Sequence, residues 1–346
     1  MSAPLRVGLV GAGRIVREGH LPAYLASASF MDVISVADPD AGQAADVAGP
    51  LGIPVRHQYQ GHAELLDGPP VDLVVVAGPP HTHHSAVVAA LASGVGVVCE
   101  KPLCVNQDEL TAIRAAADQA AARGASGFVA VLHNYLAQPG WRQLISLIRA
   151  GGIGEPRLAR FEESSGDHWR LPGETGDSWR QHAEYGGGPL RDNLYHVLYL
   201  AEQLLGSPLD RATGEQAALV HSYPAGDTAI VLARHRNGAI TQATAAWSFP
   251  GWSRAAAEVW GTTAVARYEY WSEPDQIHLD TEDGTELIKV PDWSEELASG
   301  YALSFREIAA RFRAGASAPC GTDDAQRLMR LMDQVRAATT APTGHQ

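Results

Sequence analysis

Short apolar runs alternate with helix-like stretches through the N-terminal part of the chain. Most of these runs are rich in valine and apolar on both faces, which is typical of strands buried in a parallel sheet. Between them lie alanine-rich stretches with helical spacing, such as residues 85–92 and 108–123. This alternation predicts a parallel sheet covered by helices on both faces. The predicted strands are Leu5–Val10, Val33–Ala37, Leu73–Ala77, Val95–Cys99 and Phe128–Leu132.

The pattern changes after residue 134, where longer strands separated by turn signals replace the alternation. Asn237-Gly238 predicts a hairpin turn, because this pair tolerates positive φ at both central positions. The second half is therefore expected to form a mainly antiparallel sheet with a few helices. Helices are predicted at Trp141–Arg149, Ser304–Phe312 and Asp323–Val335. Strands are predicted at Arg157–Glu163, Gln216–Ser222, Thr228–Arg236, Ala239–Trp247, Ala256–Trp260 and Ala264–Tyr270.

Length and charge narrow the class of protein. A chain of 346 residues suits two domains, and its formal net charge of −13, with no run of Lys or Arg, argues against a nucleic-acid partner. No apolar stretch approaches the roughly 20 residues that span a bilayer, and the N-terminus lacks the features of a signal peptide. The three cysteines, Cys99, Cys104 and Cys320, have no paired spacing, so we expect reduced thiols in a cytoplasmic protein.

A glycine loop follows the first predicted strand. Gly11 permits a tight turn, and Gly13 lets a pyrophosphate approach the backbone where a helix begins at Arg14 and Ile15. The third glycine of the usual pattern is replaced by Val16, a position that serves packing more than phosphate contact. The loop predicts an N-terminal Rossmann domain, here 1–134, followed by an α+β domain at 135–346 with an open sheet for substrate binding and oligomerisation.

Asp38 ends the second predicted strand, near the position of the acid that binds the adenosine ribose in NAD-binding domains. A carboxylate there accepts a hydrogen bond from the ribose 2′-hydroxyl and repels a 2′-phosphate, and no Arg or Lys follows in the next turn. We therefore expect NAD as the cofactor rather than NADP. The alternative is an aspartate that only opens a turn before Pro39.

Further along, the sequence resembles the Gfo/Idh/MocA oxidoreductase family over nearly its whole length. The resemblance lies in the glycine loop, the Ala-Gly-Pro-Pro-His-Thr-His segment at 77–83, Glu100-Lys101-Pro102, Trp179-Arg180 ahead of three glycines at 186–188, and the Asp-Asn-Leu-Tyr-His segment at 192–196. The Glu-Lys-Pro and Asp-x-x-x-His motifs, about 90 residues apart, are specific as a pair.

The resemblance implies that Lys101 is catalytic and that Glu100 lies at the cofactor. Lys101 follows a parallel strand at its carboxyl end, where open α/β sheets bind their ligands. An ammonium there can stabilise a developing alkoxide and share in proton transfer. The alternative is a solvated lysine paired with Glu100.

Asp192 and His196 are four residues apart, so on a helix they face the same way. The resemblance implies that His196 is the acid/base, with Asp192 orienting it or binding the reacting hydroxyl. Histidine suits this role because its ordinary pKa lies near neutrality. The alternative is an N-cap aspartate followed by a core histidine.

Other candidates follow from the same resemblance and from their places at strand ends. Pro79, His81 and His83 are expected beside the nicotinamide, and their spacing with His84 matches no compact zinc pattern, so no metal is predicted. Tryptophan faces stack on sugar C–H surfaces, and Arg and His supply donors to hydroxyls. The predicted substrate-binding residues are His133, Asn134, His168, Trp169, Arg170, Trp179, Arg180 and Asn193.

Together these features predict an NAD-dependent dehydrogenase acting on a sugar, amino sugar, cyclitol or related polyol. Two alternatives within the fold stay open: a redox-neutral enzyme that retains NAD and acts on a glycoside, and a non-enzymatic regulator that senses nucleotide. By analogy with the family, we expect a homodimer or homotetramer.

Overall fold

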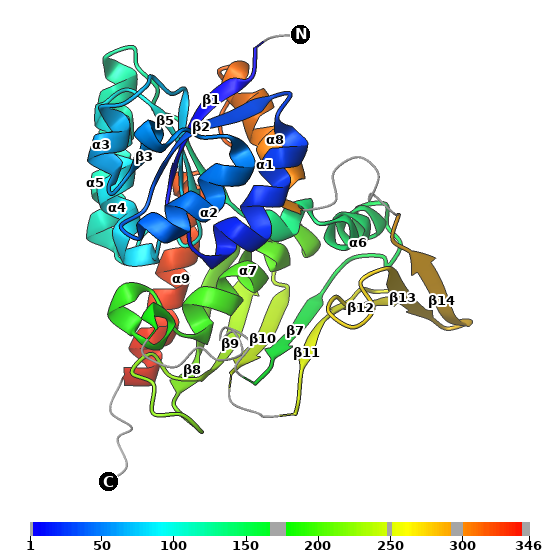
Figure 1. Cartoon of the computed structure of the whole chain (residues 1–346). Helices are drawn as coiled ribbons and strands as arrows, with labels where there is room; N and C mark the ends of the chain where they lie inside the picture. The colour runs from blue at the N-terminus through cyan, green and yellow to red at the C-terminus, as the bar shows by residue number, and fades with distance from the viewer. Residues whose placement is uncertain (1–2, 167–177, 248–250, 292–299, 341–346) are drawn as a thin grey trace. The chain divides into compact units, whose positions relative to one another are not determined.

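The structure, a computed structural model, describes residues 3–166, 178–247, 251–291 and 300–340 (Figure 1). It divides into two compact units, the first comprising residues 1–137 and 293–326 and the second residues 138–292 and 327–346. Among the helices of the described residues, none is long and apolar enough to cross a membrane.

The first unit is built on a six-stranded parallel sheet with the order β3-β2-β1-β4-β5-β6. This is the strand order of a Rossmann fold, in which the direction of winding reverses between β1 and β4. The predicted strands are confirmed with small shifts at their ends, and the short strand β3 was not predicted. The strands are β1 (Leu5–Val10), β2 (Met31–Ala37), β3 (Gln58–Tyr59), β4 (Leu73–Val76), β5 (Gly96–Glu100) and β6 (Val129–Leu132).

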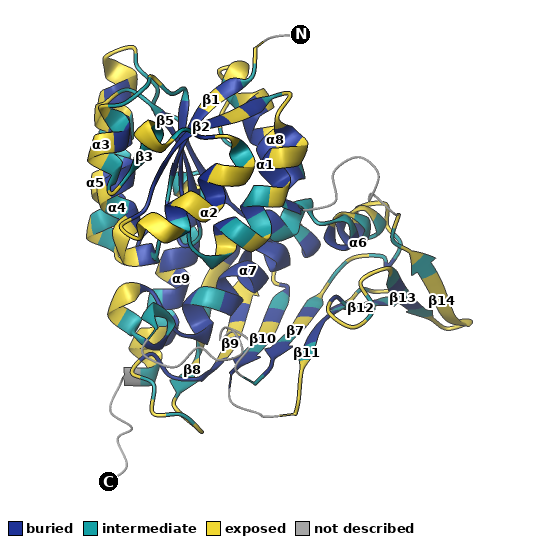
Figure 2. Cartoon of the chain, in the orientation of Figure 1, coloured by how far each residue is buried: buried dark blue, intermediate teal, exposed yellow. Residues whose placement is uncertain are grey.

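Helices cover both faces of this sheet, and their outer sides are exposed while the strands are buried (Figure 2). One face carries a π-helix, η1 (Val16–His20), with α1 (Leu21–Ser27), α2 (Ala41–Leu51) and α8 (Gly300–Arg313). The other carries α3 (His62–Leu66), α4 (Pro80–Ala92) and α5 (Gln107–Ala122). Two short 3-10 turns, η2 (Val55–His57) and η3 (Asn134–Ala137), complete the unit.

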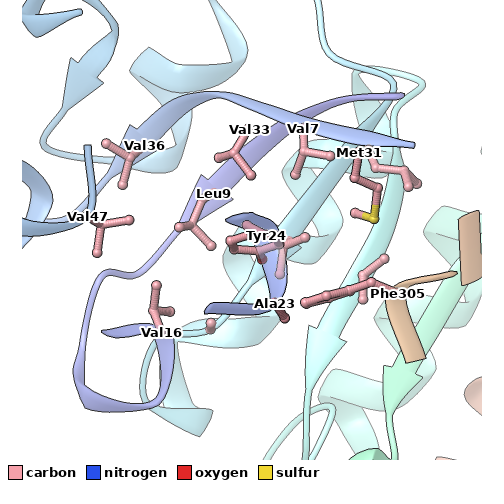
Figure 3. Packing of buried hydrophobic residues seen from close by; sticks show 14 of the residues in the cluster. Val7, Leu9, Val16, Ala23, Tyr24, Met31, Val33, Val36, Val47 and Phe305 are labelled. Carbon is pink, nitrogen blue, oxygen red and sulfur yellow. The ribbon is translucent and has the colours of Figure 1, made fainter. Parts of the chain in front are cut away.

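Helix α8 differs from the predicted division of the chain, which placed all residues from 135 to 346 in the second domain. Its Phe305 and Ile308 are buried in the same apolar core as Val7 and Leu9 of β1. Figure 3 shows Phe305 against Tyr24, and their rings stack with centroids 4.9 Å apart. Burying an aromatic side chain of this size contributes about 1.5–3 kcal/mol, which ties a distant part of the chain to the first unit.

The second unit contains an eight-stranded sheet with the order β14-β13-β12-β11-β7-β10-β9-β8. Within this second sheet, the β7–β10 pair is the only parallel one among the described strands. The predicted mainly antiparallel sheet is therefore confirmed. Its strands are β7 (Leu158–Ser164), β8 (Leu209–Ala217), β9 (Thr228–His235), β10 (Ile240–Ala246), β11 (Arg254–Trp260), β12 (Val265–Glu269), β13 (Gln276–Thr281) and β14 (Gly284–Lys289).

Helices α6 (Pro139–Arg149) and α7 (Pro189–Leu204) pack on this sheet. From Ala229 onward, strand β9 alternates between buried and exposed residues, which is the pattern of a sheet with one covered and one open face. Two short 3-10 turns, η4 (Trp179–Gln181) and η5 (Ala183–Tyr185), precede α7. The last helix, α9 (Thr322–Thr340), runs across the boundary between the two sets of residues.

Two predictions for this sheet were wrong in detail. Strand β8 spans Leu209–Ala217, so the strand predicted at 216–222 overlaps it only at Gln216 and Ala217, and β13 and β14 were missed. The hairpin at Asn237-Gly238 is confirmed, but only Gly238 has positive φ there. Gly238 donates to the carbonyl of His235, whose own N–H donates to Ala239, so the loop has three residues rather than two.

Candidate active site

The loop after β1 has the geometry of a phosphate cradle. Gly11 has φ of +97°, and a Cβ there would lie 2.6 Å from the backbone nitrogen of Gly78, so no larger residue fits. At Gly13 the opposite holds, because a Cβ would meet no atom within 4 Å. Open space above a glycine at the start of a helix is where a pyrophosphate can approach the backbone N–H groups. These residues fit a dinucleotide.

The helix that follows the loop begins at Arg14 and Ile15 and continues as the π-helix η1. Val16, in the place of the third glycine, is fully buried in the core of the first unit. The packing role of this position is therefore met by an apolar side chain. Ile15 is partly exposed, and Arg14 pairs with Glu18 one turn along at 2.9 Å. Their contact with a cofactor stays a prediction.

Asp38 is buried, and both of its carboxylate oxygens accept backbone hydrogen bonds. Oδ2 accepts from Ala12 in the glycine loop at 2.7 Å, and Oδ1 accepts from Asp40 at 2.8 Å. The second bond is the turn-opening role considered as an alternative, whereas the first ties β2 to the glycine loop. A carboxylate offers about four acceptor positions, so these two bonds leave capacity for a ribose hydroxyl.

A cation lies near this turn that the local sequence did not indicate. Arg17, from η1, donates to the carbonyl of Ala12 at 3.0 Å and to the side chain of Gln43 at 2.8 Å. The N-cap hydrogen bonds to Gln43 and Gly42, with a smaller contribution from Arg17, hold the pKa of Asp40 below its usual value. The turn after Asp38 contains no Arg or Lys, but Arg17 brings a positive charge near it from another part of the chain.

Lys101 follows directly on β5 and is half-buried. Its backbone N–H donates to Oε2 of Glu100 at 3.1 Å, and a cis peptide bond joins it to Pro102. Glu100 is buried, and its Oε1 lies 2.8 Å from Nε2 of His20. Burial alone would raise the pKa of Glu100, but the hydrogen bond and charge of His20 and the charge of Lys101 hold it below its usual value.

Glu100 therefore serves mainly inside the protein. It was predicted to contact the cofactor, but its carboxylate bonds to a buried histidine and to the Lys101 amide. His20 is fully buried and was not among the predicted residues. Its signal in the sequence was weak, because a single histidine after a glycine-loop helix is common in protein cores.

The histidines of the loop after β4 differ in their surroundings. His81 is exposed, whereas His83 is fully buried and its two ring nitrogens lie 2.9 Å from the carbonyl of Pro102 and 2.8 Å from that of Gly78. Burial lowers the pKa of His83, against the opposing effect of the two carbonyls and Glu100. The His83 ring thus lies between two loops, with a carbonyl oxygen within hydrogen-bond distance of each nitrogen, and its one N–H in the neutral form can donate to either.

Pro79 precedes α4 as its N-cap residue and leads the backbone into that helix. No group of three or more His, Cys, Asp or Glu side chains with metal-binding geometry occurs within the described ranges. His133 and Asn134 follow β6 and are buried. Oδ1 of Asn134 has no hydrogen-bond partner among the residues that the structure describes, which is the condition of a polar atom that a ligand could satisfy.

In the second unit, three glycines shape the start of α7. A Cβ on Gly187 would lie 2.4 Å from the carbonyl oxygen of Arg180, so only glycine lets these two turns touch. Gly188 donates to that same carbonyl at 2.8 Å and caps α7. The glycines therefore dock the Trp179–Arg180 turn on the first turn of α7, where Asp192 lies.

Arg180 and Asp192 form an ion pair, with Nε of Arg180 donating to Oδ2 of Asp192 at 2.8 Å. The Arg180 guanidinium also stacks over the Trp179 ring, 4.4 Å from its centroid. Because Gly188 is the N-cap of α7, the alternative of Asp192 as an N-cap is wrong. Arg180, one of the predicted substrate-binding residues, is thus paired with Asp192 and holds it in place.

His196 is buried one turn along α7, and its Nδ1 lies 2.6 Å from the hydroxyl of Tyr199. Asp192 was predicted to orient this ring, and the structure shows Tyr199 bonding to Nδ1. A partner on Nδ1 fixes the orientation of the imidazole ring. Tyr199 was missed because a tyrosine three residues along an apolar helix is usually a packing residue.

Asn193 was predicted to bind substrate, but its side chain belongs to a buried network. Nδ2 donates to Glu163 at 2.9 Å, Oδ1 accepts from Trp247 at 2.7 Å, and Tyr270 donates to Glu163 at 2.6 Å. These bonds tie α7 to the sheet and account for both polar atoms of the Asn193 amide. His168, Trp169 and Arg170 lie outside the described residues.

Comparison with known proteins identifies the family of both halves of the chain. The model of the oxidoreductase family with an NAD-binding Rossmann fold matches residues 5–128, and the model of the GFO/IDH/MocA C-terminal domain matches residues 141–267. The chain belongs to the Gfo/Idh/MocA family. The model matched by residues 5–128 is that of an NAD-binding Rossmann fold, as the sequence predicted.

Named relatives cover this family member to different extents. Inositol 2-dehydrogenase 3 of Saccharopolyspora erythraea is 35% identical over 158 residues, 45% of this chain and 44% of the relative. The scyllo-inositol 2-dehydrogenase (NAD(+)) of Bacillus subtilis is 24% identical over 332 residues, 93% and 90% of the two chains. The chain spans only 44% to 64% of the length of four curated relatives, that of Saccharopolyspora erythraea included.

Solved structures share the fold. An inositol dehydrogenase homolog from Azotobacter vinelandii, complexed with NADH and myo-inositol, superposes with a TM-score of 0.81 at 21% identity, covering 99% of this chain and 97% of that one. At this identity the likeness establishes the fold alone.

Proposed function

We propose that this protein is an NAD-dependent dehydrogenase that oxidises a carbinol, or reduces the corresponding carbonyl, on a cyclitol, sugar, amino sugar or related polyol. The observation that carries the proposal is the position of Lys101. It stands at the carboxyl end of β5, beside β4 and the point where the winding of the sheet reverses. Ligands of open α/β sheets bind at this point.

The cofactor's place follows from the carboxyl edge of the first sheet. The Gly11–Gly13 loop and the N-terminus of η1 would receive the pyrophosphate, and Asp38 would meet the adenosine ribose. NAD supplies the acceptor for the hydride, and the protein supplies alignment and charge. Gly11 packs directly on Gly78, so the loops after β1 and β4 form one continuous surface.

The proton and the developing charge are assigned to three side chains. Lys101 donates a hydrogen bond to the reacting oxygen and stabilises it as an alkoxide while the carbon–hydrogen bond breaks. His196 accepts the hydroxyl proton at Nε2, with Tyr199 holding Nδ1. Asp192, paired with Arg180, binds a substrate hydroxyl and sets its orientation.

The substrate class is supported by the relatives' names and by the polar residues available. Two relatives are inositol dehydrogenases, and the Azotobacter homolog was solved with myo-inositol. Asn134, with an unsatisfied buried oxygen, suits a ligand rich in hydroxyl donors. We further propose that the enzyme works in the cytoplasm with its cysteines as thiols, and that it is a homodimer or homotetramer.

The open face of the second sheet is the proposed contact between copies. Ile230 and Leu232 of β9 are about half exposed, on the side away from α7. Two large apolar residues on one strand, on an uncovered sheet face, are typical of an interface rather than of a solvated surface.

A screen for NADH formation tests the activity. Purified protein with NAD is offered myo-inositol, scyllo-inositol, D-glucose, D-glucosamine and levoglucosan, and NADH absorbance is followed, with Lys101→Met as control. The proposal expects release of NADH with at least one polyol and none from the variant. If NAD stays bound through gel filtration and NADH never accumulates, the redox-neutral alternative gains; activity equal to wild type in the variant contradicts the proposed mechanism.

A further inference from the structure

Two buried histidines contact the turn that carries Lys101, one on each side of it. His20 reaches the turn from η1, the helix of the glycine loop, and His83 reaches it from α4. Neither side chain has any exposed surface. Burying a polar imidazole costs free energy unless the ring is hydrogen-bonded. Two fully buried imidazoles at one three-residue turn therefore point to a role for their hydrogen bonds beyond filling space.

His20 acts on the residue before Lys101. Its Nε2 donates to Oε1 of Glu100 at 2.8 Å, and Oε2 of the same carboxylate accepts the Lys101 backbone N–H at 3.1 Å. The rings of Tyr24, Tyr301 and Phe305 surround the imidazole, and the Tyr24 hydroxyl lies 3.3 Å from Nδ1. The imidazole is therefore fixed, and through Glu100 it fixes the Lys101 amide.

His83 acts on the residue after Lys101. Its Nδ1 lies 2.9 Å from the carbonyl oxygen of Pro102, and its Nε2 lies 2.8 Å from the carbonyl oxygen of Gly78. Gly78 in turn packs against Gly11 of the glycine loop. One ring thus joins the loop after β4, which borders the phosphate cradle, to the turn after β5.

Lysine needs such support more than most catalytic residues. Its ammonium sits on a flexible four-carbon stem, so the protein controls its position chiefly through the backbone from which the stem starts. Displacing a reacting group by about 1 Å can cost a hundredfold in rate. Removing His20 would leave a buried carboxylate oxygen without its donor, and removing His83 would leave the carbonyl oxygens of Gly78 and Pro102 without the imidazole between them, which favours a rearranged turn.

We propose that His20 and His83 are positioning residues for Lys101, which fix its backbone through the Glu100 carboxylate on one side and the Pro102 carbonyl on the other. The inference rests on the proposed function, in which Lys101 is the catalytic ammonium. It assigns a role to His20, which the sequence motifs did not single out, and changes the role of His83 from cofactor contact to support of the turn.

Two kinds of measurement test this inference, one of which needs neither substrate nor cofactor. The first is amide hydrogen exchange of the segment Cys99–Cys104 in the protein without ligand. The second is a set of kcat and KM values with the most active polyol from the screen, together with the Kd for NADH. The variants are His20→Leu and His83→Leu, with His20→Gln and His20→Asn as a matched pair.

Glutamine places an amide nitrogen near the position of imidazole Nε2, whereas asparagine is too short to reach Glu100. His20→Leu, His20→Asn and His83→Leu should speed exchange at Lys101 and lower kcat by about tenfold or more, while the Kd for NADH changes by less than about threefold. His20→Gln should recover most of both losses. If the leucine variants do not fold, the glutamine–asparagine pair still decides.

His235→Leu is the control for the loss of a buried histidine. His235 is buried in β9 and bonds through both ring nitrogens, to the carbonyl of Ser207 and the hydroxyl of Thr241. This variant should lower Tm without changing exchange at Lys101 or kcat. Wild-type kcat and exchange in His20→Asn, or equal losses in His235→Leu, would overturn the inference. Full activity of Lys101→Met would instead overturn the proposed function and leave the exchange result to judge the turn.

Discussion

At the scale of single residues, the candidate site depends on what each side chain is already bonded to. Glu100, His83 and Asn193 all lie in motifs shared with the family, yet their polar atoms make hydrogen bonds within the protein. We expect a side chain whose polar atoms are used internally to contribute position, and one with an open acceptor, such as Asn134, to contribute contact with a ligand. Substituting a residue of the first kind should disturb the local structure, whereas substituting one of the second kind should weaken ligand binding.

Gly11 and Gly13 should separate these two kinds of failure. Gly11→Ala places a Cβ 2.6 Å from Gly78 at a positive φ, so it should lower stability by about 1–3 kcal/mol and abolish NADH binding. Gly13→Ala meets no protein atom, so Tm should stay near that of wild type while the Kd for NADH rises about tenfold or more. Thermal melts and NADH titrations measure both effects. Unchanged NADH affinity in Gly13→Ala would place the pyrophosphate elsewhere.

Cofactor preference is the second prediction at this scale. A 2′-phosphate near Asp38 would meet a carboxylate, and like unit charges about 4 Å apart at an effective dielectric near 20 repel by about 4 kcal/mol. The enzyme should therefore prefer NAD to NADP by a hundredfold or more in kcat/KM. Asp38→Ser with Pro39→Arg should relax this preference by exchanging repulsion for a phosphate partner.

Arg17 bears on this prediction, because it is a cation close to the turn that follows Asp38. Its guanidinium lies near Asp40, but it is held by Ala12 and Gln43, so we expect it not to compensate a phosphate. Equal use of the two cofactors by the wild-type enzyme would mean that Asp38 serves only the loop and the turn, through the bonds to Ala12 and Asp40.

At the scale of elements, sequence periodicity predicted most strands with at least one continuous buried face and failed for β14 and most of β8. Leu5–Val10 was predicted to the residue, because an unbroken apolar run has little competing interpretation. β14 is exposed along almost its whole length, and β8 begins among polar residues, so neither carries a hydrophobic signal at its start. Their pairing with neighbouring strands decides their structure.

The candidate site residues also divide into those that the sequence indicated and those that it did not. Motif residues such as Lys101, Asp192 and His196 could be found from the sequence, because their spacing is specific. His20, Tyr199 and the Arg180–Asp192 pair could not, because their partners lie far along the chain or fall within ordinary helical patterns. Contacts that depend on tertiary packing leave no periodic trace in one sequence.

Docking of the Trp179–Arg180 turn on α7 gives a prediction at this scale. Gly187→Ala puts a Cβ against the carbonyl of Arg180, so it should push the turn away from Asp192 and lower kcat/KM about tenfold, with NADH affinity unchanged. Gly49→Ala, in α2, meets no atom within 4 Å and serves as the control. Equal kinetics for the two variants would show that the turn does not shape the site.

At the scale of the whole molecule, the open sheet face should determine the oligomeric state. Leu232→Glu places a charge on the exposed side of β9, where a second copy would bury it without a partner. Light scattering should show an oligomer for wild type and a monomer for this variant. Leu25→Glu, an equally exposed leucine on α1, should leave the oligomer intact. A monomeric wild type would contradict the proposed contact.

The most direct test of the account is the turnover of Lys101→Met measured beside its affinity for NADH. Methionine keeps an unbranched stem but removes the ammonium, so the fold and the glycine loop should be untouched. We predict that kcat falls by a hundredfold or more, on the order of the loss of one oxyanion-hole donor, while the Kd for NADH stays within about threefold of wild type. Near wild-type turnover with intact NADH binding would contradict the assignment of Lys101 as the catalytic ammonium.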